Sequence, residues 1–437
     1  MLGPVFADAD FEELFPERGR PAISPARLAL VSVLQFVEGL TDRQAAHAVR
    51  SRLDWKYALS LELTDTGFDF SVLSEFRARL VEGQASRRVF DAVLLAAGQA
   101  GLVKAGGRQR TDSTHVLAVT REVNRLEFCT ETLRAALNQI AETAGQWLAA
   151  LAAPEWFDRY STRPEDSRFP SRWSARMAQG NQVGADGMTV LAAVWGLTAP
   201  PQLRTLPAVE ILRQAWIQQY EMHDGDVRWR EAKQLPPGRM LLRSPYDAEA
   251  RTGGKRDLNW DGYKLHLSET CEPNAPHLIT NVTTTQASAT DVETTTQIHT
   301  DLAGRRLLPE THLVDAGYVD AHHIASARHE YRIDLLGPVQ TSTGWQNKDG
   351  NGFAASDFTI DWDHQKVTCP GAQTNSRWRN DHSQAGTPVI RVEFPARHCN
   401  PCTVRDRCTR SSSGRKLTLR PRLEHGALQH AKARQDT

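Results

Sequence analysis

Hydrophobic positions recur with helical spacing along the first hundred residues. Apolar residues at intervals of three and four positions predict helices at about residues 25–39, 42–49, 71–83 and 88–101. Ser24 is a typical N-cap before Pro25, and Thr41 with Gln44 fits a capping box, so the first two helices have clear starts. The sequence therefore predicts an all-helical N-terminal domain over residues 1–104.

The pattern changes to that of a β-strand around Asp112. Residues 107–119 favour an extended chain, in which alternation puts Asp112 on the face opposite Thr111 and Ser113. A carboxylate on such a strand either ends a sheet or binds a ligand. Asp112 is therefore the first candidate functional residue.

Helical spacing returns after this strand and then gives way to alternating strands and helices. Tryptophans and prolines interrupt the helical pattern over about residues 121–240, which we interpret as a helical insertion with loops. The pattern after it predicts two strands, a helix, a strand ending near Asp315, a helix and a further strand. This order indicates an α/β domain with a mixed sheet over residues 105–358, followed by a cysteine-containing, arginine-rich segment over residues 359–437.

Length and composition limit the class of protein. A chain of 437 residues with 40% hydrophobic residues is long for one core, so two or three soluble domains are expected. The formal net charge of +0 gives no global sign of nucleic-acid binding, and the locally basic C-terminal segment is either a phosphate-binding segment or a solvated tail. Without a secretory signal, a membrane-spanning run or a dense cysteine pattern, the chain is expected to be cytoplasmic.

Asp315 is the second carboxylate of interest. It ends a short apolar strand, and Gly317 permits a sharp turn into the next helix. A single aspartate there is as often a helix cap as a metal ligand. A mixed sheet could bring Asp112 and Asp315 together, and two such carboxylates need a cation or a shared proton because they repel each other. Oxygen ligands suit Mg²⁺ or Mn²⁺, and two such ions about 4 Å apart would support phosphoryl transfer.

Four short segments carry the two aspartates and the strands between them. They are Thr111-Asp112-Ser113-Thr114, Ser244-Pro245-Tyr246-Asp247-Ala248-Glu249-Ala250-Arg251, Trp260-Asp261-Gly262-Tyr263-Lys264 and Val314-Asp315-Ala316-Gly317-Tyr318. With the helical N-terminal domain and the late cysteines, these motifs resemble bacterial insertion-sequence transposases of the DDE type over nearly the whole chain. The resemblance implies an α/β fold, a ribonuclease H-like mixed sheet with a helical insertion, preceded by the all-helical domain.

The resemblance also implies a reaction. Asp112 and Asp315 would be catalytic and would bind the Mg²⁺ or Mn²⁺ ions that cut and join transposon-end DNA. Such transposases carry a third acid, a glutamate in a Tyr-x2-Arg-x3-Glu pattern on a late helix, and no segment here has that form. Glu424 lacks the surrounding tyrosine and arginine, and we interpret it as a surface residue. We therefore expect a chain truncated before its third acid and catalytically incomplete.

Double-stranded DNA, at transposon ends and at target sites, is the implied partner. The short N-terminal helices suit a helix-turn-helix-like module, although small helical domains with surface arginines are common. Later in the chain, Arg251 and Lys264 either contact phosphates or pair with acids. The predicted DNA-binding residues are Arg43, Arg77, Arg79, Arg251 and Lys264. No membrane partner is expected, and a homo-oligomer stays open.

The late cysteines are candidates for a separate metal site. Cys399 and Cys402 have the spacing of a metal knuckle, and Cys369 and Cys408 could complete four thiolates around a structural Zn²⁺. The spacing to Cys408 is looser than in common zinc fingers, and Cys369 is distant. Reduced structural cysteines are the alternative.

Three hypotheses follow from these patterns. The first is a DDE transposase that hydrolyses a phosphodiester at a transposon end and drives the freed 3′-hydroxyl into target DNA. The second is a non-catalytic DNA-binding product of the same ancestry. The third is a zinc-stabilised DNA-binding regulator in which Asp112 and Asp315 are ordinary helix caps.

Overall fold

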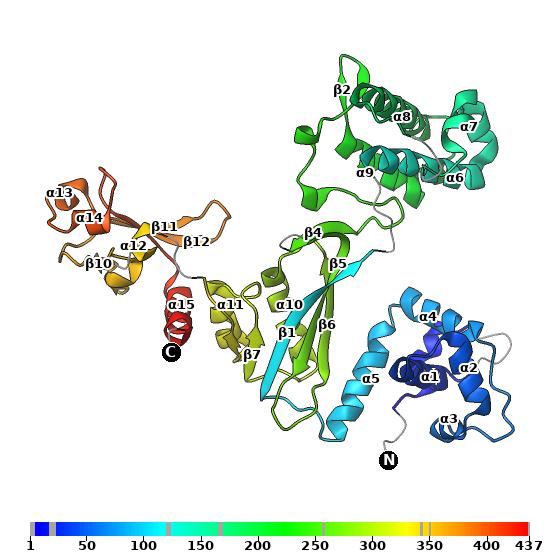
Figure 1. Ribbon diagram of the computed structural model, residues 1–437, viewed down its shortest axis with the longest axis horizontal. Coiled ribbons are helices and arrows are strands. Elements are labelled where there is room, and N and C mark those ends of the chain that lie inside the picture. The colour runs from blue at the N-terminus through cyan, green and yellow to red at the C-terminus, as the bar shows by residue number, and fades with distance from the viewer. Residues whose placement is uncertain are drawn as a thin grey trace.

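The computed structural model describes residues 5–16, 23–118, 124–164, 169–255, 258–340, 344–348 and 351–435. These residues form a helical N-terminal domain, a central sheet, a helical domain inserted between two strands of that sheet, and a C-terminal β module (Figure 1). Val119, which ends the predicted first strand, and the predicted start of the insertion at residues 121–123 lie outside the described residues. No helix among the described residues is long and apolar enough to cross a membrane.

The N-terminal domain is helical, as the spacing of its apolar residues predicts. Thr41 and Gln44 form the predicted capping box at the start of the second helix. The apolar faces of the helices meet around Trp55 and Phe76, which are buried. The helices are η1 (Asp8–Leu14, a 3₁₀ helix), α1 (Pro25–Glu38), α2 (Asp42–Ser51), α3 (Leu53–Ala58), α4 (Ser71–Glu82) and α5 (Ser86–Gln99). The helical pattern does not predict η1 or α3.

The central sheet is mixed. Its strands are β1 (Arg108–Leu117), β4 (Arg251–Lys255), β5 (Leu258–Thr270), β6 (Ile279–Gln286), β7 (Thr311–Val314) and β8 (Asp334–Leu336). They are hydrogen-bonded in the order β4-β5-β1-β7-β8, with β6 also paired to β5. β1 runs antiparallel to β5 and parallel to β7, and β7 is parallel to β8. The predicted fold class, a ribonuclease H-like mixed sheet with a helical insertion behind a helical N-terminal domain, is confirmed.

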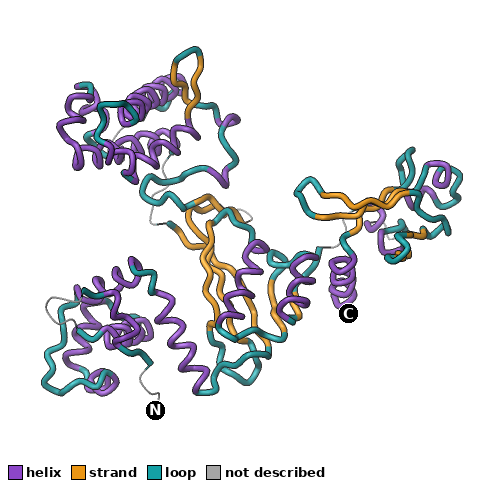
Figure 2. Tube along the Cα trace, turned by 180° about the vertical axis from the view of Figure 1, so that it is seen from behind, coloured by secondary structure: helices purple, strands orange, loops and turns teal. Residues whose placement is uncertain are grey.

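Two helical crossovers connect the later strands. α10 (Asp291–Gly304) joins β6 to β7 and packs on β6. α11 (Ala321–Ser326) and the π-helical turn η6 (Ala327–Tyr331) join β7 to the parallel strand β8. Figure 2 shows these helices alongside the strands. Parallel neighbouring strands require such crossovers, so these helices allow β7 to pair in parallel with β1 and with β8.

A buried chain of hydrogen bonds joins α10 to β7, β1 and β5. His299 Nε2 on α10 lies 2.9 Å from His312 Nδ1, and His312 Nε2 lies 2.7 Å from Thr111 Oγ1. Thr111 Oγ1 also lies 2.6 Å from Ser268 Oγ. Burial lowers the pKa of His299 to about 4 and that of His312 to about 3. Both rings are therefore neutral at pH 7, and the chain ties four elements together without a buried charge.

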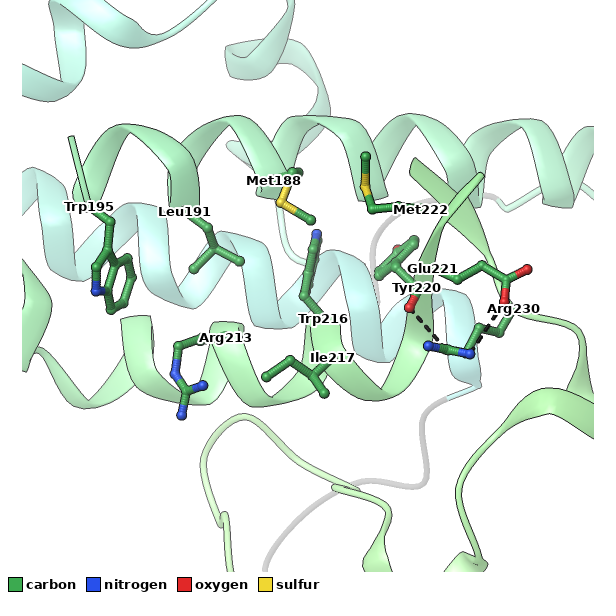
Figure 3. Close-up of a pocket in the computed structure, with 10 residues that line it drawn as sticks. All are labelled: Met188, Leu191, Trp195, Arg213, Trp216, Ile217, Tyr220, Glu221, Met222 and Arg230. Atoms are coloured by element: carbon green, nitrogen blue, oxygen red, sulfur yellow. Dashed lines mark hydrogen bonds and ion pairs between the residues drawn. The ribbon is translucent and has the colours of Figure 1, made fainter. Parts of the chain in front are cut away.

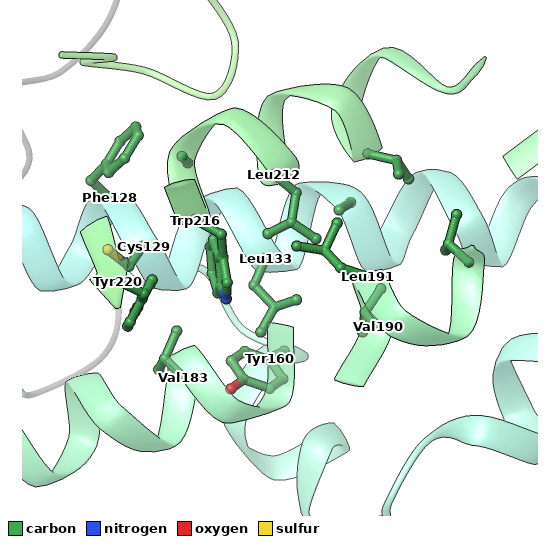
Figure 4. Packing of buried hydrophobic residues seen from close by; sticks show 14 of the residues in the cluster. Phe128, Cys129, Leu133, Tyr160, Val183, Val190, Leu191, Leu212, Trp216 and Tyr220 are labelled. Carbon is green, nitrogen blue, oxygen red and sulfur yellow. The ribbon is translucent and has the colours of Figure 1, made fainter. Parts of the chain in front are cut away.

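The insertion is a helical domain with its own apolar core (Figure 4). Its elements are α6 (Arg125–Leu151), α7 (Pro154–Tyr160), α8 (Trp173–Val194), η3 (Pro201–Thr205), α9 (Pro207–Gln219), the hairpin β2 (Tyr220–His223) and β3 (Asp226–Trp229), and the 3₁₀ turns η4 (Ala232–Gln234) and η5 (Gly238–Met240). Two aromatic rings lie directly on α8, where a Cβ at Gly184 or Gly187 would collide with Tyr220 or Trp216. The helical interpretation of this region misses the β2–β3 hairpin.

The insertion leaves and re-enters the sheet at one place. Leu117, the last residue of β1, and Arg251, the first residue of β4, both pair with Gly262 of β5. Gly262 has a φ of 148°, and a Cβ there would collide with the carbonyl oxygen of Val116. Glycine is therefore required where the two ends of the insertion meet β5.

The C-terminal module is a separate β structure that ends in a long helix. Its elements are α12 (Trp345–Lys348), η7 (Ala355–Asp357), β9 (Thr359–Asp361), β10 (Lys366–Thr368), β11 (Arg377–His382), β12 (Pro388–Glu393), α13 (Ala396–Cys399), α14 (Arg405–Cys408), β13 (Lys416–Leu419) and α15 (Arg422–Gln435). α15 leaves the module and packs on α11, where Ala427, Leu428 and Ala431 join the apolar cluster around Ile324. The C-terminal helix therefore connects the module to the central sheet.

The buried histidine chain predicts a loss of stability in mild acid. The unfolded chain binds a proton at a histidine near pH 6.5, whereas folded His299 does so only near pH 4. The free energy of unfolding should therefore fall as the pH drops from about 6.5 to about 4. Replacing His299 by glutamine should reduce this fall by about 3 kcal/mol, measured by urea unfolding at pH 7 and pH 4. The exposed His329→Gln is the control. An unchanged pH dependence in His299→Gln would contradict the prediction.

Candidate active site where β1 and β7 part

The register of two parallel strands makes Asp112 and Asp315 neighbours. Thr111 pairs with Val314 at the end of the β1–β7 ladder, and the next residue on each chain is an aspartate. Neighbouring strands lie about 4.8 Å apart. Both aspartates are exposed, whereas Thr111 is buried. The structure therefore brings the two sequence-predicted catalytic residues to adjacent positions, open to solvent, where the strands separate.

Main-chain N–H groups hold both carboxylates. The N–H of Ser113 donates to Asp112 Oδ1 at 2.7 Å, and the N–H of Gly317 donates to Asp315 Oδ1 at 2.8 Å. Each carboxylate keeps a second oxygen that these bonds do not use. The two side chains are oriented by their own segments and still present oxygen to a ligand.

Asp291 is a third carboxylate at this site, and the sequence interpretation missed it. A Cβ added at Gly317 would lie 2.9 Å from Asp291 Oδ2 and 3.0 Å from Asp315 Oδ1, so both oxygens face the same glycine. Asp291 Oδ1 accepts a hydrogen bond from Lys264 Nζ at 3.0 Å. A capping box explains the sequence at the start of α10 and draws attention away from Asp291. The sequence offers one signal for Asp291: like Asp315, it lies between a predicted strand and a predicted helix.

Gly317 is needed for space rather than for turn geometry. Its φ lies outside the left-handed region, so the sharp turn that the sequence interpretation assigns to it is not the reason for glycine. The reason is that oxygens of Asp315 and Asp291 lie close to the position that a Cβ would take. A side chain there would have to displace one carboxylate or both.

Tyr318 lies buried beneath the three carboxylates. Its hydroxyl lies 2.6 Å from His266 Nδ1, and it also shares a hydrogen bond with Ser113. Burial raises the pKa of Tyr318 well above its usual value, and the negative charges of Asp291, Asp112 and Asp315 raise it further. Tyr318 is therefore neutral at pH 7, and its hydroxyl supports β1 through Ser113.

Four of the five side chains predicted to contact DNA are engaged within the chain. Arg77 donates to Asp42 at 2.6 Å, Arg79 to the carbonyl of Leu14 at 3.1 Å, Arg251 to the carbonyls of Ala248 and Ala250 at 2.8 Å, and Lys264 to Asp291 and to the carbonyl of Ala289. Arg43 is exposed, with its guanidinium 4.1 Å from the centre of the Phe70 ring. The structure brings Lys264 to the aspartates, and Arg43, Arg77 and Arg79 lie in the N-terminal domain.

Glu424 is not the surface residue that the sequence suggests. Its side chain is only 12% exposed, and it lies 3.4 Å from His322 Nδ1 and 4.0 Å from Arg420. The contact of α15 with α11 covers it, an effect of tertiary packing that local sequence does not reveal.

The sequence predicts metal ligands at two places, the aspartates and the four late cysteines. Among the described residues, no three His, Cys, Asp or Glu side chains form a group that could hold a metal. At the aspartates, two adjacent carboxylates would share an ion with other ligands. In the C-terminal module, Cys369, Cys399, Cys402 and Cys408 line one small cavity.

A cavity of about 740 Å³ lies elsewhere, in the insertion (Figure 3). It is open and mainly apolar, with Met188, Trp216, Ile217 and Met222 in its lining. None of the three aspartates lines it. The cavity is therefore separate from the candidate active site.

Two families match the ends of the chain. Residues 4–79 match a transposase domain (DUF772), and residues 368–437 match a transposase DDE domain. Searches of curated proteins and of solved structures gave no match. The first match covers α1 to α3 and most of α4, and the second covers the four late cysteines and α15. Asp112, Asp291 and Asp315 lie between the two matched segments.

Gly317→Ala should disturb the carboxylates more than the fold. The added Cβ would press on two side-chain oxygens, which can move, so the thermal unfolding midpoint should change little. Affinity for Mn²⁺, measured by electron paramagnetic resonance, should fall about tenfold because the ligands lose their support. Gly304→Ala is the matched control, since its Cβ would meet nothing within 4 Å. Equal Mn²⁺ affinity in both variants would refute this role of Gly317.

Proposed function

Because this chain is a member of the DDE transposase family, by the domains matched at both of its ends, we propose that it cleaves DNA at transposon ends and joins the freed end to target DNA. Asp112 and Asp315 are the proposed catalytic carboxylates. The observation that carries the proposal is the β1–β7 register, in which the pairing of Thr111 with Val314 is followed on each strand by an exposed aspartate.

The donor set fits a hard divalent cation. Carboxylate oxygen is the usual ligand of Mg²⁺ and Mn²⁺, and Mg²⁺ commonly takes only one or two protein carboxylates and completes its shell with water and substrate phosphate. When bound, such ions make water a better nucleophile and stabilise the charge on the leaving oxygen of a phosphodiester. The proposed ligands are Asp112 and Asp315, with Asp291 nearby and partly neutralised by Lys264.

The chain's own residues fix this site in place. Ser113 and Gly317 donate main-chain hydrogen bonds that orient the carboxylates. Tyr318 supports β1 without adding charge. The glycine at position 317 leaves the space that Asp291 and Asp315 occupy. The protein would thus supply a preformed pair of carboxylates to the divalent ions that contact the reacting phosphate.

DNA is the proposed substrate, and basic side chains would contact its phosphates. Arg108 and Arg110 are exposed on the same face of β1 as Asp112, although Arg110 also pairs with Glu269. The N-terminal helices would add contacts from outside the sheet. The proposed contacts are Arg43, Arg77, Arg79, Arg251 and Lys264, and their strength should decrease with salt.

DNA binding without cleavage is the second candidate function. It is favoured by the sequence, in which no segment has the Tyr-x2-Arg-x3-Glu form of the third acid. Glu424 lies 3.4 Å from His322 Nδ1, and this candidate assigns it no catalytic role. This candidate keeps the DNA contacts and loses the reaction.

The deciding experiment incubates the full chain with DNA that carries the ends flanking its gene. In Mg²⁺ or Mn²⁺ the wild-type chain should nick the ends and produce strand-transfer products. Asp112→Asn and Asp315→Asn should each lower cleavage at least about a hundredfold, the upper range for disturbed metal sites, while DNA binding is retained. Denaturing gels measure cleavage and mobility shifts measure binding.

Asp224→Asn is the matched control, because Asp224 is 83% exposed at the tip of the β2–β3 hairpin. It should cleave like the wild type. Cleavage that survives Asp112→Asn would overturn the proposed site. Sequence-specific binding of the ends by a wild-type chain that never cleaves them would favour the second candidate.

A further inference from the structure

The four cysteines of the C-terminal module line one small cavity. Cys369 lies just after β10, Cys399 ends α13, Cys402 follows it and Cys408 ends α14. The cavity has a volume of about 20 Å³. A cavity needs roughly 10–15 Å³ to hold one water molecule, so this one has room for an ion and not for an organic ligand.

The turn after β10 brings sulfur atoms from distant segments together. A Cβ added at Gly371 would lie 3.5 Å from Cys402 Sγ and 3.7 Å from Cys369 Sγ, so both sulfurs face the same glycine. The main-chain N–H of Gln373 donates to Cys369 Sγ at 3.3 Å. An N–H bond of this kind stabilises a thiolate and commonly supports a metal-bound sulfur.

Arg415 and the apolar core of the module hold Cys408 at this cavity. The Arg415 guanidinium lines the same cavity and donates to the carbonyl of Cys408 at 2.9 Å. Cys369, Cys399 and Cys408 all pack against the buried apolar side chains of the module.

We propose that Cys369, Cys399, Cys402 and Cys408 bind one Zn²⁺ through four thiolates. Zn²⁺ accepts four sulfurs in a tetrahedral arrangement, and soft thiolate ligands favour it over the ions that carboxylates bind. Four protons leave the thiols as the four zinc–sulfur bonds form. Among the described residues these side chains do not form a metal-holding group, so binding would require the cysteine side chains to turn toward the ion.

The module has a physical need for such a crosslink. Its apolar core contains seven buried side chains: Phe358, Val367, Ile390, Val392, Phe394, Leu417 and Leu419. A core of this size gives little stability by itself, and small modules usually add a disulfide or a metal. All four cysteines are free thiols. Zinc would tie the turn after β10 to the α13–α14 segment, which follows β12 in the chain.

The crosslink would also position the last helix. β13 follows α14 directly and leads into α15, which packs on α11 beside the central sheet. Arg434 of α15 donates to Asp334 of β8 at 2.7 Å. Zinc would therefore fix the geometry of the module from which α15 emerges, independently of the reaction at Asp112.

The test measures zinc in the full chain, purified with a reductant and dialysed against zinc-free buffer. We expect one zinc per chain by elemental mass spectrometry. Of the six cysteines, four should react with a thiol reagent only after a chelator removes the metal. Retention of no zinc, with no uptake when zinc chloride is added to the dialysed chain, would overturn the proposal.

Variants test the ligand set. Cys402→Ser should lower the retained zinc at least about tenfold. Cys271→Ser is the matched control, because Cys271 is a partly buried thiol outside the cavity. His398→Asn tests the nitrogen donor that lines the same cavity and should keep its zinc. Zinc loss from either control, or full zinc in Cys402→Ser, would reject the four-sulfur site. If Cys402→Ser does not fold, thiol protection in the wild-type chain decides.

Discussion

The parallel pairing of β1 with β7 is the interaction on which the candidate active site depends. It places Asp112 beside Asp315 although the two residues are far apart in the chain. The hydrogen-bonded chain from His299 through His312 to Thr111 crosses this pairing one residue before Asp112. A charged bond in this place would carry a desolvation cost, whereas neutral imidazoles satisfy their polar atoms at little cost. Hydrogen bonds thus join β1 to β7 and α10 at Thr111, one residue before the exposed Asp112.

The candidate active site carries more negative than positive charge. Asp112, Asp291 and Asp315 bring three carboxylates close to Tyr318, while Lys264 is the ammonium group paired with one of them. The remaining negative charge is tolerated because Asp112 and Asp315 are exposed to water. It also gives the site an electrostatic preference for cations before any DNA arrives. The surrounding main-chain bonds hold this charge in place and do not neutralise it.

The parts of the fold that depend on local sequence were predicted well. The capping box at Thr41 and the helical spacing around Phe76 gave the N-terminal helices, because capping and amphipathicity act within a few residues. The β2–β3 hairpin was missed although Asp224-Gly225 is a typical hairpin turn, since the flanking residues continue a helical pattern. Burial of Glu424 by α11 could not be predicted, because it arises from contact between distant segments.

The candidate active-site residues also divide into those that local sequence reveals and those that only tertiary packing reveals. Asp112 stands out as the one carboxylate in a β-like run of hydroxyls and bases, and Asp315 as a carboxylate that ends a short apolar strand. Asp291 does not, since its helix-start sequence already has a sufficient local explanation. Only the shared approach to Gly317 relates it to Asp315, and that approach is a property of packing. Its position between a strand and a helix was a local signal, but that signal did not relate Asp291 to the other two carboxylates.

Gly262 has a consequence for how this protein can change over evolutionary time. Since Leu117 and Arg251 flank that one residue, the whole inserted domain is topologically the loop of a β-hairpin. Its length and surface can vary while the register of β1 against β5 stays the same. The inserted domain could thus be exchanged at this joint without moving Asp112 relative to Asp315.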